Sequence, residues 1–479
     1  MRSVKMNEIK KISVKEASCI LILVLLIMGG GVIGFGLSPQ VPVMLAMGTI
    51  ILWAKLKRFS WASVNLGIKD GIEKGIIPIF IFILIGAMIS TWIAAGTIPS
   101  LMVLGFKIIS VRWFLPSVFV VCTLVGAAVG SAFTVASTVG IAFMGMGITM
   151  GLNPAMIAGS IISGAIFGDK LSPLSETNNL ASAVVDTELF EHIRNLLWST
   201  LPAGILTAVL FMIVGHDNSS MSLERINKTV AILNSHFNIS FWAVIPIVLV
   251  FLCAGFKMPA VPTMLLNIFV TSIMIFVQDP QIPLKKLAEI ITNGFVAKTG
   301  NVTVNTLLSR GGIVSMMPTV ALIVLTLSLG GLLVRFGLIR TVMAPLAKHL
   351  NSTGKLITAG ILACLGVNIF VGEQFLSIIL PGRAFKQTFN AGGLANDALG
   401  RVLEDGGTVI NYLVPWGVGG VFLANTLSVP TVHYLPFVFF SLLCPLFSIL
   451  SGFTGVGLKR ISAGDALVDT NAVEGSQIN

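Results

Sequence analysis

Apolar runs about as long as a bilayer is thick recur along most of this chain, and they constrain its fold more than any other feature. Clear examples are Ser18–Phe35, Ile76–Ala95 and Leu196–Val214. Of the 479 residues, 55% are hydrophobic and only 10% are charged, whereas a soluble protein carries roughly 25% charged residues. The sequence therefore predicts an all-α polytopic membrane protein of about ten to thirteen membrane-crossing or re-entrant segments, at roughly 20 residues each.

The net charge of +10 comes from basic residues in short segments beside the apolar runs. Arg2, Lys5 and Lys10 precede the first run, and Lys459 and Arg460 follow the last one. Because basic residues flank membrane segments on the cytoplasmic side, this pattern predicts a multi-pass protein of the cell membrane with both termini in the cytoplasm. The lipid bilayer accounts for the charge, so we expect no nucleic-acid partner.

A polar stretch from Gly168 to Leu180 directly follows the apolar run Pro154–Phe167. It combines two carboxylates with hydroxyl and amide side chains and a proline, namely Asp169, Ser172, Pro173, Ser175, Glu176, Thr177, Asn178 and Asn179. Lipid solvates neither these groups nor a helix interrupted by proline, so such a segment is stable only where it lines a water-filled cavity or binds a solute. We therefore expect a transport site here.

A second segment, Gly130–Gly140, is small and rich in hydroxyl groups, which come from Ser131, Thr134, Ser137 and Thr138. Two interpretations remain open for it. Small residues whose hydroxyls bond within their own helix favour close helix packing. Alternatively, these hydroxyls form a second wall of the site.

Polar interruptions recur in the second half at a matching spacing. The hydroxyl-rich segment starts 37 residues before the first acidic break (168 − 131), and a similar segment starts 37 residues before a second acidic break (403 − 366). An offset of 235 (404 − 169) therefore places Asp169 on Glu404. The second half would contribute Asn368, Glu373, Asp405, Thr408 and Asn411 to the site.

Matching interruptions in two halves are typical of transporters built from two inverted repeats, with broken helices and the binding site at the repeat interface. We predict repeat halves at residues 1–215 and 241–455 and a polar connection at 216–240. A cytoplasmic tail would occupy residues 456–479.

The residue types at these breaks suit exchange of a cation for a proton. A dehydrated Na⁺ takes oxygen ligands from carboxylates, hydroxyls and the carbonyls of unwound backbone, and a partly buried carboxylate can bind a proton instead. We expect Asp169 to be the principal Na⁺ ligand and proton carrier. Glu404 is interpreted as an interfacial residue at a helix end, and His192 as a loop residue.

Other function classes lack their sequence signatures. The chain has no Walker A, GxSxG or HExxH motif and no histidine or cysteine spacing typical of a metal site. We therefore expect neither an enzyme nor an ATP-driven pump, and no cofactor, with Na⁺ and H⁺ as transported or coupling ions. A passive channel would leave the scattered carboxylates without a role.

Six motifs together resemble the NhaC family of Na⁺/H⁺ antiporters. They are Gly168–Leu180, Leu189–Ile193, Leu307–Gly312, Gly372–Arg383, Leu403–Thr408 and Val414–Trp416. The resemblance extends from about Ile76 to Phe453, and it implies two inverted repeats with re-entrant hairpins. It also implies ion coordination around Asp169, Ser172, Glu176, Thr177, Glu373 and Asp405.

The same family includes antiporters that exchange malate and protons for lactate and Na⁺, so a small carboxylate is the alternative substrate. Two departures from the family pattern bear on that choice. Ser131–Thr134 replaces a run resembling Thr-Ser-Trp-Gly, and Gly417 follows Trp416 where many relatives carry a polar residue. We expect a homodimer only by analogy with related transporters.

Overall fold

The computed structural model describes residues 12–109, 111–215, 223–346, 350 and 352–461, and these residues are helical almost throughout. Within these ranges β-type pairing is limited to an isolated antiparallel bridge between Leu394 and Arg460. Seven helices of the described chain are long and apolar enough to cross a membrane, or up to nine if each bent pair is one span. The predicted all-α polytopic fold is therefore confirmed.

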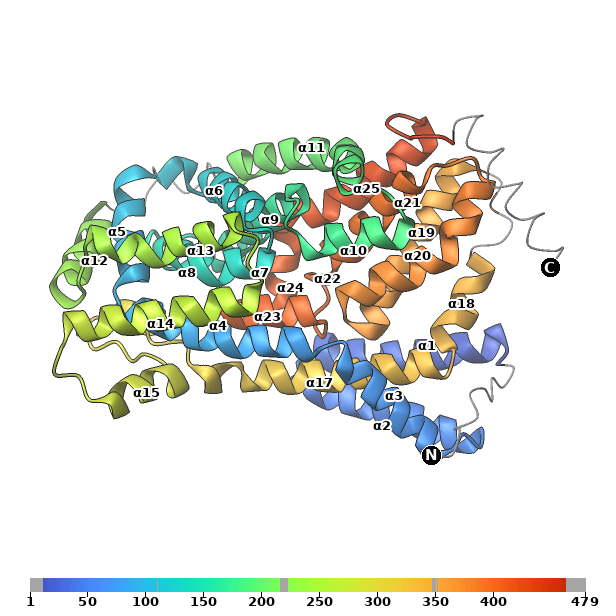
Figure 1. Cartoon of the computed structure of the whole chain (residues 1–479), viewed down its shortest axis with the longest axis horizontal. Helices are drawn as coiled ribbons and strands as arrows, with labels where there is room; N and C mark the ends of the chain where they lie inside the picture. The colour runs from blue at the N-terminus through green and yellow to red at the C-terminus, as the bar shows by residue number, and fades with distance from the viewer. Residues whose placement is uncertain (1–11, 110, 216–222, 347–349, 351, 462–479) are drawn as a thin grey trace.

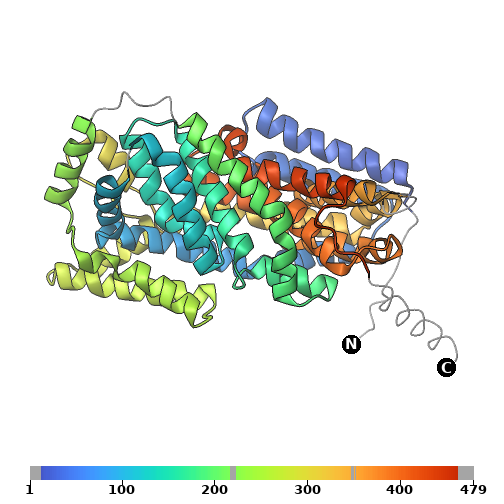
Figure 2. The same ribbon diagram turned by 90° about the horizontal axis from the view of Figure 1, so that it is seen from above.

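Helices outside the repeated hairpins form the flanks of the molecule. They are α1 (Val14–Gly29), which continues as a π-helical turn (Gly30–Gly34), α2 (Gln40–Leu56), α3 (Trp61–Glu73), α4 (Ile76–Ala94), α5 (Thr97–Ile108), α12 (Leu223–His236), α13 (Ile245–Gly255), α14 (Ala260–Gln278), α15 (Leu284–Asn293), α16 (Val302–Leu308), α17 (Ile313–Arg335) and α18 (Leu338–Leu346). Helices α14 and α17 both pack on α4 along the long axis (Figure 1). In Figure 2 the first blue helices and the yellow-green helices lie at opposite edges.

The flanking helices present large apolar side chains outward. Leu26, Phe256 and Phe269 are 66%, 83% and 64% exposed, respectively. Apolar surface of this kind suits contact with lipid rather than water. The flanks therefore separate the polar interior described below from the membrane.

The first repeat consists of α6 (Phe114–Val129), α7 (Ala132–Val135), the π-helical segment η3 (Ala136–Gly140), α8 (Ile141–Thr149), α9 (Pro154–Leu171), α10 (Glu176–Val185) and α11 (Leu189–Val214). The second consists of α19 (Thr353–Val371), α20 (Gln374–Ala391), α21 (Asn396–Leu403), the π-helical segment η6 (Glu404–Thr408), α22 (Val409–Asn411), α23 (Val418–Leu427), α24 (Thr431–Tyr434) and α25 (Phe439–Thr454). Each repeat is interrupted twice. The breaks fall between α6 and α7, between α9 and α10, between α19 and α20, and between α22 and α23.

The breaks correspond at an offset of 242 residues rather than the predicted 235. Gly130 ends α6 and Gly372 ends α19 (372 − 130), both with φ of 70°. Asp186 ends α10 and Ser428 ends α23 (428 − 186), with φ of 55° and 56°. The offset of 235 was wrong because it aligned residues by their acidic side chains, whereas the repeats share backbone conformation.

Close helix packing follows the same offset. A Cβ at Gly164 would lie 2.9 Å from Cys122 Cβ, and a Cβ at Gly406 would lie 2.9 Å from Cys364 Cβ. These glycines let α9 approach α6 and η6 approach α19. At this offset Asp169 corresponds to Asn411 rather than to Glu404 (411 − 169).

The boundaries of the halves stay predictions, but the connection between them has a structure of its own. Helix α12 (Leu223–His236) occupies most of the segment predicted as a polar connection, and residues 216–222 lie outside the described residues. Of the predicted tail, residues 462–479 also lie outside them. The inverted orientation of the two repeats stays a prediction.

Candidate functional site

A cavity of about 530 Å³ lies where the breaks of the two repeats meet. Eight residues predicted for the site line it, namely Ser131, Thr134, Asp169, Ser175, Glu176, Thr177, Glu373 and Asn411. The other predicted residues are not among the described residues that line it: Ser137, Thr138, Ser172, Asn178, Asn368, Asp405 and Thr408. The structure therefore brings residues from both repeats to one cavity.

The two breaks of each repeat are packed against each other by a glycine. Gly130 has a left-handed backbone, and a Cβ there would lie 2.7 Å from the carbonyl carbon of Leu174 and 2.8 Å from Ser175 N. In the second repeat a Cβ at Gly372 would lie 3.3 Å from Gly417 Cα. Only glycine combines this conformation with such close approach, so the unwound segments of each repeat lie side by side.

Helix N-termini face the cavity from both repeats. Ser131 caps α7 by accepting a hydrogen bond from Thr134 N at 3.3 Å. Glu373, 242 residues later (373 − 131), caps α20 by accepting a hydrogen bond from Leu376 N at 2.8 Å. The caps satisfy otherwise free N–H groups at the helix starts and hold both side chains at the cavity wall.

Asp169 lies in the last turn of α9, which extends four residues beyond the predicted apolar run and ends at Leu171. Its side chain is buried, with 6% of the residue exposed. The Ser175 side chain and the Ala132 backbone N–H both contact its carboxylate. Its Oδ1 atom has no hydrogen-bond partner among the described residues. A buried carboxylate oxygen without a partner is costly unless it binds a cation or a proton.

Hydroxyl groups from the start of α10 complete this side of the cavity. Ser175 Oγ and Thr177 Oγ1 are 3.0 Å apart. Glu176, between them, also lines the cavity and belongs to the first turn of α10. Together with Ser131 and Thr134, these residues place several oxygen atoms around Asp169.

Asn178 stabilises the break instead of lining the cavity. Its Nδ2 donates to the carbonyl oxygens of Lys170 at 3.0 Å and Ser172 at 2.9 Å. These carbonyls lie where α9 ends and therefore lack partners within the helix. Ser172 Oγ accepts a hydrogen bond from Leu174 N at 3.2 Å, so it too supports the turn.

Ser137 and Thr138 bond within their own helical segment, which decides between the two interpretations for this pair. Ser137 Oγ donates to Phe133 O at 2.8 Å, and Thr138 Oγ1 donates to Thr134 O at 2.6 Å. Both side chains are buried. The hydroxyl-rich segment is therefore divided, with Ser131 and Thr134 at the cavity and the later hydroxyls in helix packing.

The second repeat holds its unwound backbone with two asparagines. Asn368 Nδ2 donates to Gly406 O at 3.1 Å and to Gly407 O at 2.7 Å. Asn411 Nδ2 donates to Asn368 Oδ1 at 2.9 Å, and Asn411 Oδ1 accepts from Gly419 N at 3.0 Å. Asn368 is thus a supporting residue, whereas Asn411 belongs to both this network and the cavity wall.

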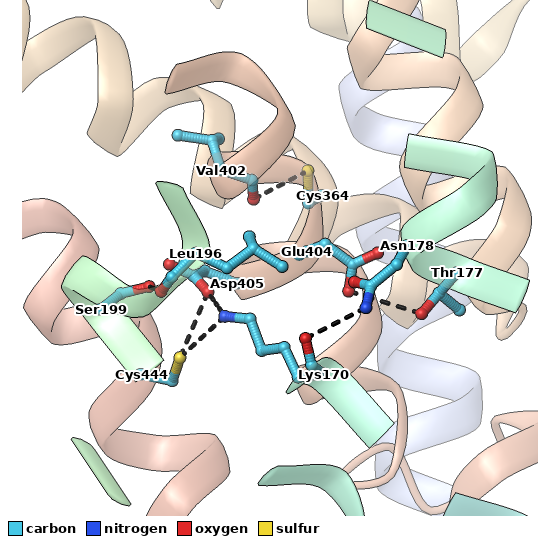
Figure 3. A network of polar contacts seen from close by, with 10 residues as sticks. All are labelled: Lys170, Thr177, Asn178, Leu196, Ser199, Cys364, Val402, Glu404, Asp405 and Cys444. Carbon is cyan, nitrogen blue, oxygen red and sulfur yellow. Dashed lines mark hydrogen bonds and ion pairs between the residues drawn. The ribbon is translucent and has the colours of Figure 1, made fainter. Parts of the chain in front are cut away.

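A buried ion pair between Lys170 and Asp405 was missed at the sequence level. Lys170 Nζ donates to Asp405 Oδ1, and both side chains have no exposed surface. Cys444 Sγ lies 3.1 Å from Lys170 Nζ and 3.2 Å from Asp405 Oδ1 (Figure 3). The available signal was a lysine at the end of a membrane-length apolar run, where a buried charge needs a carboxylate partner.

Two interpretations of single residues were wrong. Glu404 is completely buried in η6 rather than interfacial, and its Oε2 lies 3.5 Å from Thr177 Oγ1 (Figure 3). His192 is buried in α11 rather than in a loop. In both cases a tertiary contact from a distant helix covers a residue that looked peripheral in sequence.

The described residues include no group of three or more histidine, cysteine, aspartate or glutamate side chains that could hold a resident metal ion. The cavity instead combines single carboxylates with hydroxyl and amide oxygens. Such a set suits a weakly held monovalent cation that must also leave.

Comparison with known proteins gives concordant results. Residues 164–456 match the Na⁺/H⁺ antiporter family. The chain is 38% identical to the Na⁺/H⁺ antiporter NhaC of Alkalihalophilus pseudofirmus, over 88% of this chain and 92% of that protein. It is 36% identical to the Na⁺/H⁺ antiporter NhaC of Bacillus subtilis, over 87% and 92%. It is also 32% identical to the malate-2H⁺/Na⁺-lactate antiporter of Bacillus subtilis, over 88% and 92%.

Proposed function

Because the chain belongs to the Na⁺/H⁺ antiporter family, we propose that it exchanges cytoplasmic Na⁺ for external H⁺ across the cell membrane. The protein is a multi-pass membrane transporter and not an enzyme. The observation that carries the proposal is the unpartnered Oδ1 atom of Asp169, buried at the wall of a cavity lined by hydroxyl groups.

Na⁺ and H⁺ would compete for the Asp169 carboxylate. With Na⁺ present, the carboxylate and the oxygens of Ser131, Thr134, Ser175 and Thr177 replace water around the ion. With a proton present, the carboxyl group is neutral and the attraction for Na⁺ is lost. The site is stable only when it holds either Na⁺ or H⁺. Movement of Na⁺ in one direction is therefore coupled to movement of H⁺ in the other.

Glu176 and Glu373 would support the site from its two sides, since both line the cavity. Asp405 is engaged by Lys170, and Ser172 supports the turn, so we leave both outside the cation site. The transported ions are the only small molecules that this proposal requires, and it includes no cofactor.

The test is Na⁺-driven proton movement in proteoliposomes that contain a pH-sensitive dye. Asp169→Asn, which keeps the shape but removes the charge, should abolish the signal. The matched control is Asp279→Asn, because Asp279 is an exposed acid after α14. Full activity of the Asp169→Asn protein would refute the assignment.

The malate-2H⁺/Na⁺-lactate relative defines the alternative outcome. If Na⁺ alone moves no protons but Na⁺ with malate or lactate does, a small carboxylate is the substrate and Na⁺ is a coupling ion. Two further proposals have tests of their own. Native mass spectrometry would detect the homodimer, and labelling, in intact cells, of cysteines introduced at the two termini would check that both ends are cytoplasmic.

A further inference from the structure

Three helices turn buried polar faces toward one another beside the Lys170–Asp405 pair. Each face has residues three or four positions apart, which lie on one side of a helix. We refer to the following nine buried residues as the polar seam: His192, Asn195 and Ser199 of α11, Asp397, Arg401 and Asp405 of the α21–η6 segment, and Cys444, Ser448 and Ser451 of α25. None of the nine is among the described residues that line the cavity.

Direct contacts hold the three faces together. At the end of the seam nearest Lys170, Cys444 Sγ lies 3.2 Å from Asp405 Oδ1. Two turns further along α25, Ser451 Oγ accepts a hydrogen bond from Arg401 Nη2 at 2.9 Å. His192 lies against the α21 backbone, because a Cβ at Gly400 would be 2.7 Å from His192 Nδ1. The α21–η6 segment and α25 are therefore joined at both of these points, with α11 packed on α21.

The two ends of the seam differ in environment. Its inner end is the completely buried Lys170–Asp405 pair, next to Glu404 (Figure 3). At its outer end Lys459 Nζ donates to Asp397 Oδ2 at 2.8 Å and lies 3.6 Å from Glu191 Oε2. The Lys459 and Glu191 side chains are 54% and 59% exposed. Helical rise puts Asp397 and Asp405 roughly 12 Å apart, so the seam leads from the protein surface to the buried Lys170–Asp405 pair.

The seam is rich in polar atoms that the protein itself does not satisfy. Among the described residues, no hydrogen-bond partner exists for these buried atoms: His192 Nδ1 and Nε2, Asn195 Nδ2, Asp397 Oδ1, Arg401 Nε, Asp405 Oδ2 and Ser448 Oγ. Each such group destabilises the folded protein if it stays unpaired. Native proteins satisfy clustered buried polar groups with ordered water, and here the cluster forms a line.

We propose that the polar seam holds a file of bound waters that carries protons between the surface at Lys459 and Glu404, whose Oε2 lies 3.5 Å from Thr177 Oγ1 of the cavity wall, so that protons reach the Asp169 site by a route other than the opening that admits Na⁺. The inference rests on the proposed function and adds a second route to it. Along such a file each transfer breaks one O–H bond and forms another, so no further reactant is needed. The charges that act on His192 include Lys170 from α9 and Asp397 and Asp405 from the α21–η6 segment, and Arg401 lies between the two aspartates on the same buried face.

The test separates proton movement from Na⁺ movement in the same proteoliposomes. Ser448→Leu fills the seam with an apolar side chain, and His192→Phe removes both ring nitrogens. Either variant should slow Na⁺-driven proton movement by about tenfold or more, whereas exchange of radioactive Na⁺ for unlabelled Na⁺ at equal pH should stay within about twofold of wild type. Sodium exchange needs the cavity but no proton route.

The matched controls are Leu446→Phe on α25 and Ile205→Phe on α11, because these side chains are 54% and 66% exposed toward lipid. Both should leave the two rates unchanged. If Ser448→Leu does not yield a monodisperse protein, Asn195→Leu replaces it as a seam variant. Equal loss of both rates in a well-folded seam variant would show a purely structural seam, and no loss of either rate would show that protons use the cavity. Both results overturn the inference.

The proposed function fails on a different observation. Wild-type protein that exchanges Na⁺ for Na⁺ but never moves protons would refute the antiport proposal, and the seam would then have no proton to carry. If wild type shows both rates and only the seam variants behave unexpectedly, the antiport proposal stands and the seam inference alone falls.

Discussion

Lys170 of α9 and Asp405 of η6 form an ion pair that joins the two repeats, and neither side chain has any exposed surface. Two charges removed from water in this way are stable only as a pair, because each alone carries a desolvation penalty of several kcal/mol. The pair fixes the end of α9, and therefore the backbone of Asp169, relative to the second repeat. A structural pair thus positions Asp169, the carboxylate that we propose to bind Na⁺ and H⁺.

The first prediction follows from this dependence. Lys170→Met and Asp405→Leu should each lower the free energy of unfolding by about 3–5 kcal/mol, because each leaves one buried charge without a partner. The double variant should lose less than either single variant. Denaturant unfolding in detergent measures all three, and additive losses in the double variant would argue against a coupled pair.

A surface pair supplies the control for this experiment. Lys386 and Asp186 also form an ion pair, but the Asp186 side chain is 76% exposed. Lys386→Met should therefore cost no more than about 1 kcal/mol.

Gly130 and Gly372 give the second prediction. Both have φ of 70°, and a Cβ at Gly130 would collide with Leu174 at 2.7–2.8 Å. Gly130→Ala should therefore cost more than the roughly 1–2 kcal/mol of left-handed strain alone, and it should also slow transport because the first-repeat breaks are pushed apart. Thermal unfolding and proton flux on the same preparation would show this.

The control for Gly130→Ala separates strain from collision. Gly337 has φ of 75°, and a Cβ there would meet nothing within 4 Å. Gly337→Ala should therefore show the strain without the effect on transport. Equal behaviour of the two variants would mean that contact between the breaks does not matter.

The sequence indicated the first-repeat break well because its signal is local. A carboxylate and a proline directly after an apolar run, as at Asp169 and Pro173, require a break whatever the tertiary structure does. The structure places the break at residues 172–175 between α9 and α10. The length of α9 was underestimated, because Asp169 and Lys170 look like the start of a loop until their buried partners are known.

The residues that were missed depend on contacts between distant segments. Lys170 and Asp405 are 235 residues apart, so nothing in the local sequence of either one specifies the pair. Glu404 looked like a helix end because the helices that bury it, mainly α19 and α20, are distant from it in the sequence. The sequence indicated a repeat, but not the offset between its two copies. That offset becomes clear only when glycines with the same backbone conformation, such as Gly130 and Gly372, are aligned with each other.

The third prediction concerns pH and the outer end of the polar seam. The hydrogen bond with Asp397 raises the pKa of Lys459 above its ordinary value of 10.5. A lysine whose pKa is higher in the folded than in the unfolded protein stabilises the fold at every pH below its unfolded-state pKa. This stabilisation is lost as the pH rises through its folded-state pKa. Lys459→Met should therefore be less stable than wild type at neutral pH, and the difference should shrink above about pH 10.5.

Lys459→Arg provides the comparison, because a guanidinium stays charged across this range. It should match wild type at neutral pH and exceed its stability at the alkaline end. Melting temperatures of wild type and both variants, measured in detergent from neutral to strongly alkaline pH, test these expectations. A stability gap between wild type and Lys459→Met that widens with pH would contradict the pairing with Asp397.

The asparagine network of the second repeat gives the last prediction. Asn368 Nδ2 donates to the carbonyls of both Gly406 and Gly407, and its Oδ1 accepts from Asn411. Asn368→Leu leaves three buried polar groups without partners, at about 1–3 kcal/mol each. We expect a large loss of stability together with slower transport, since Asn411 at the cavity wall loses its support.

Asn368→Asp refines this test because it keeps the size and the acceptor but removes the two donated hydrogen bonds. It should still accept from Asn411 Nδ2 and therefore retain more transport than Asn368→Leu, while both variants lose stability. Asn234→Leu, at an exposed position on α12, should change neither quantity. Because Asn368 does not line the cavity, a Michaelis constant for Na⁺ that rises at unchanged maximal rate in Asn368→Asp would contradict its role as a support for unwound backbone and indicate direct contact with the ion.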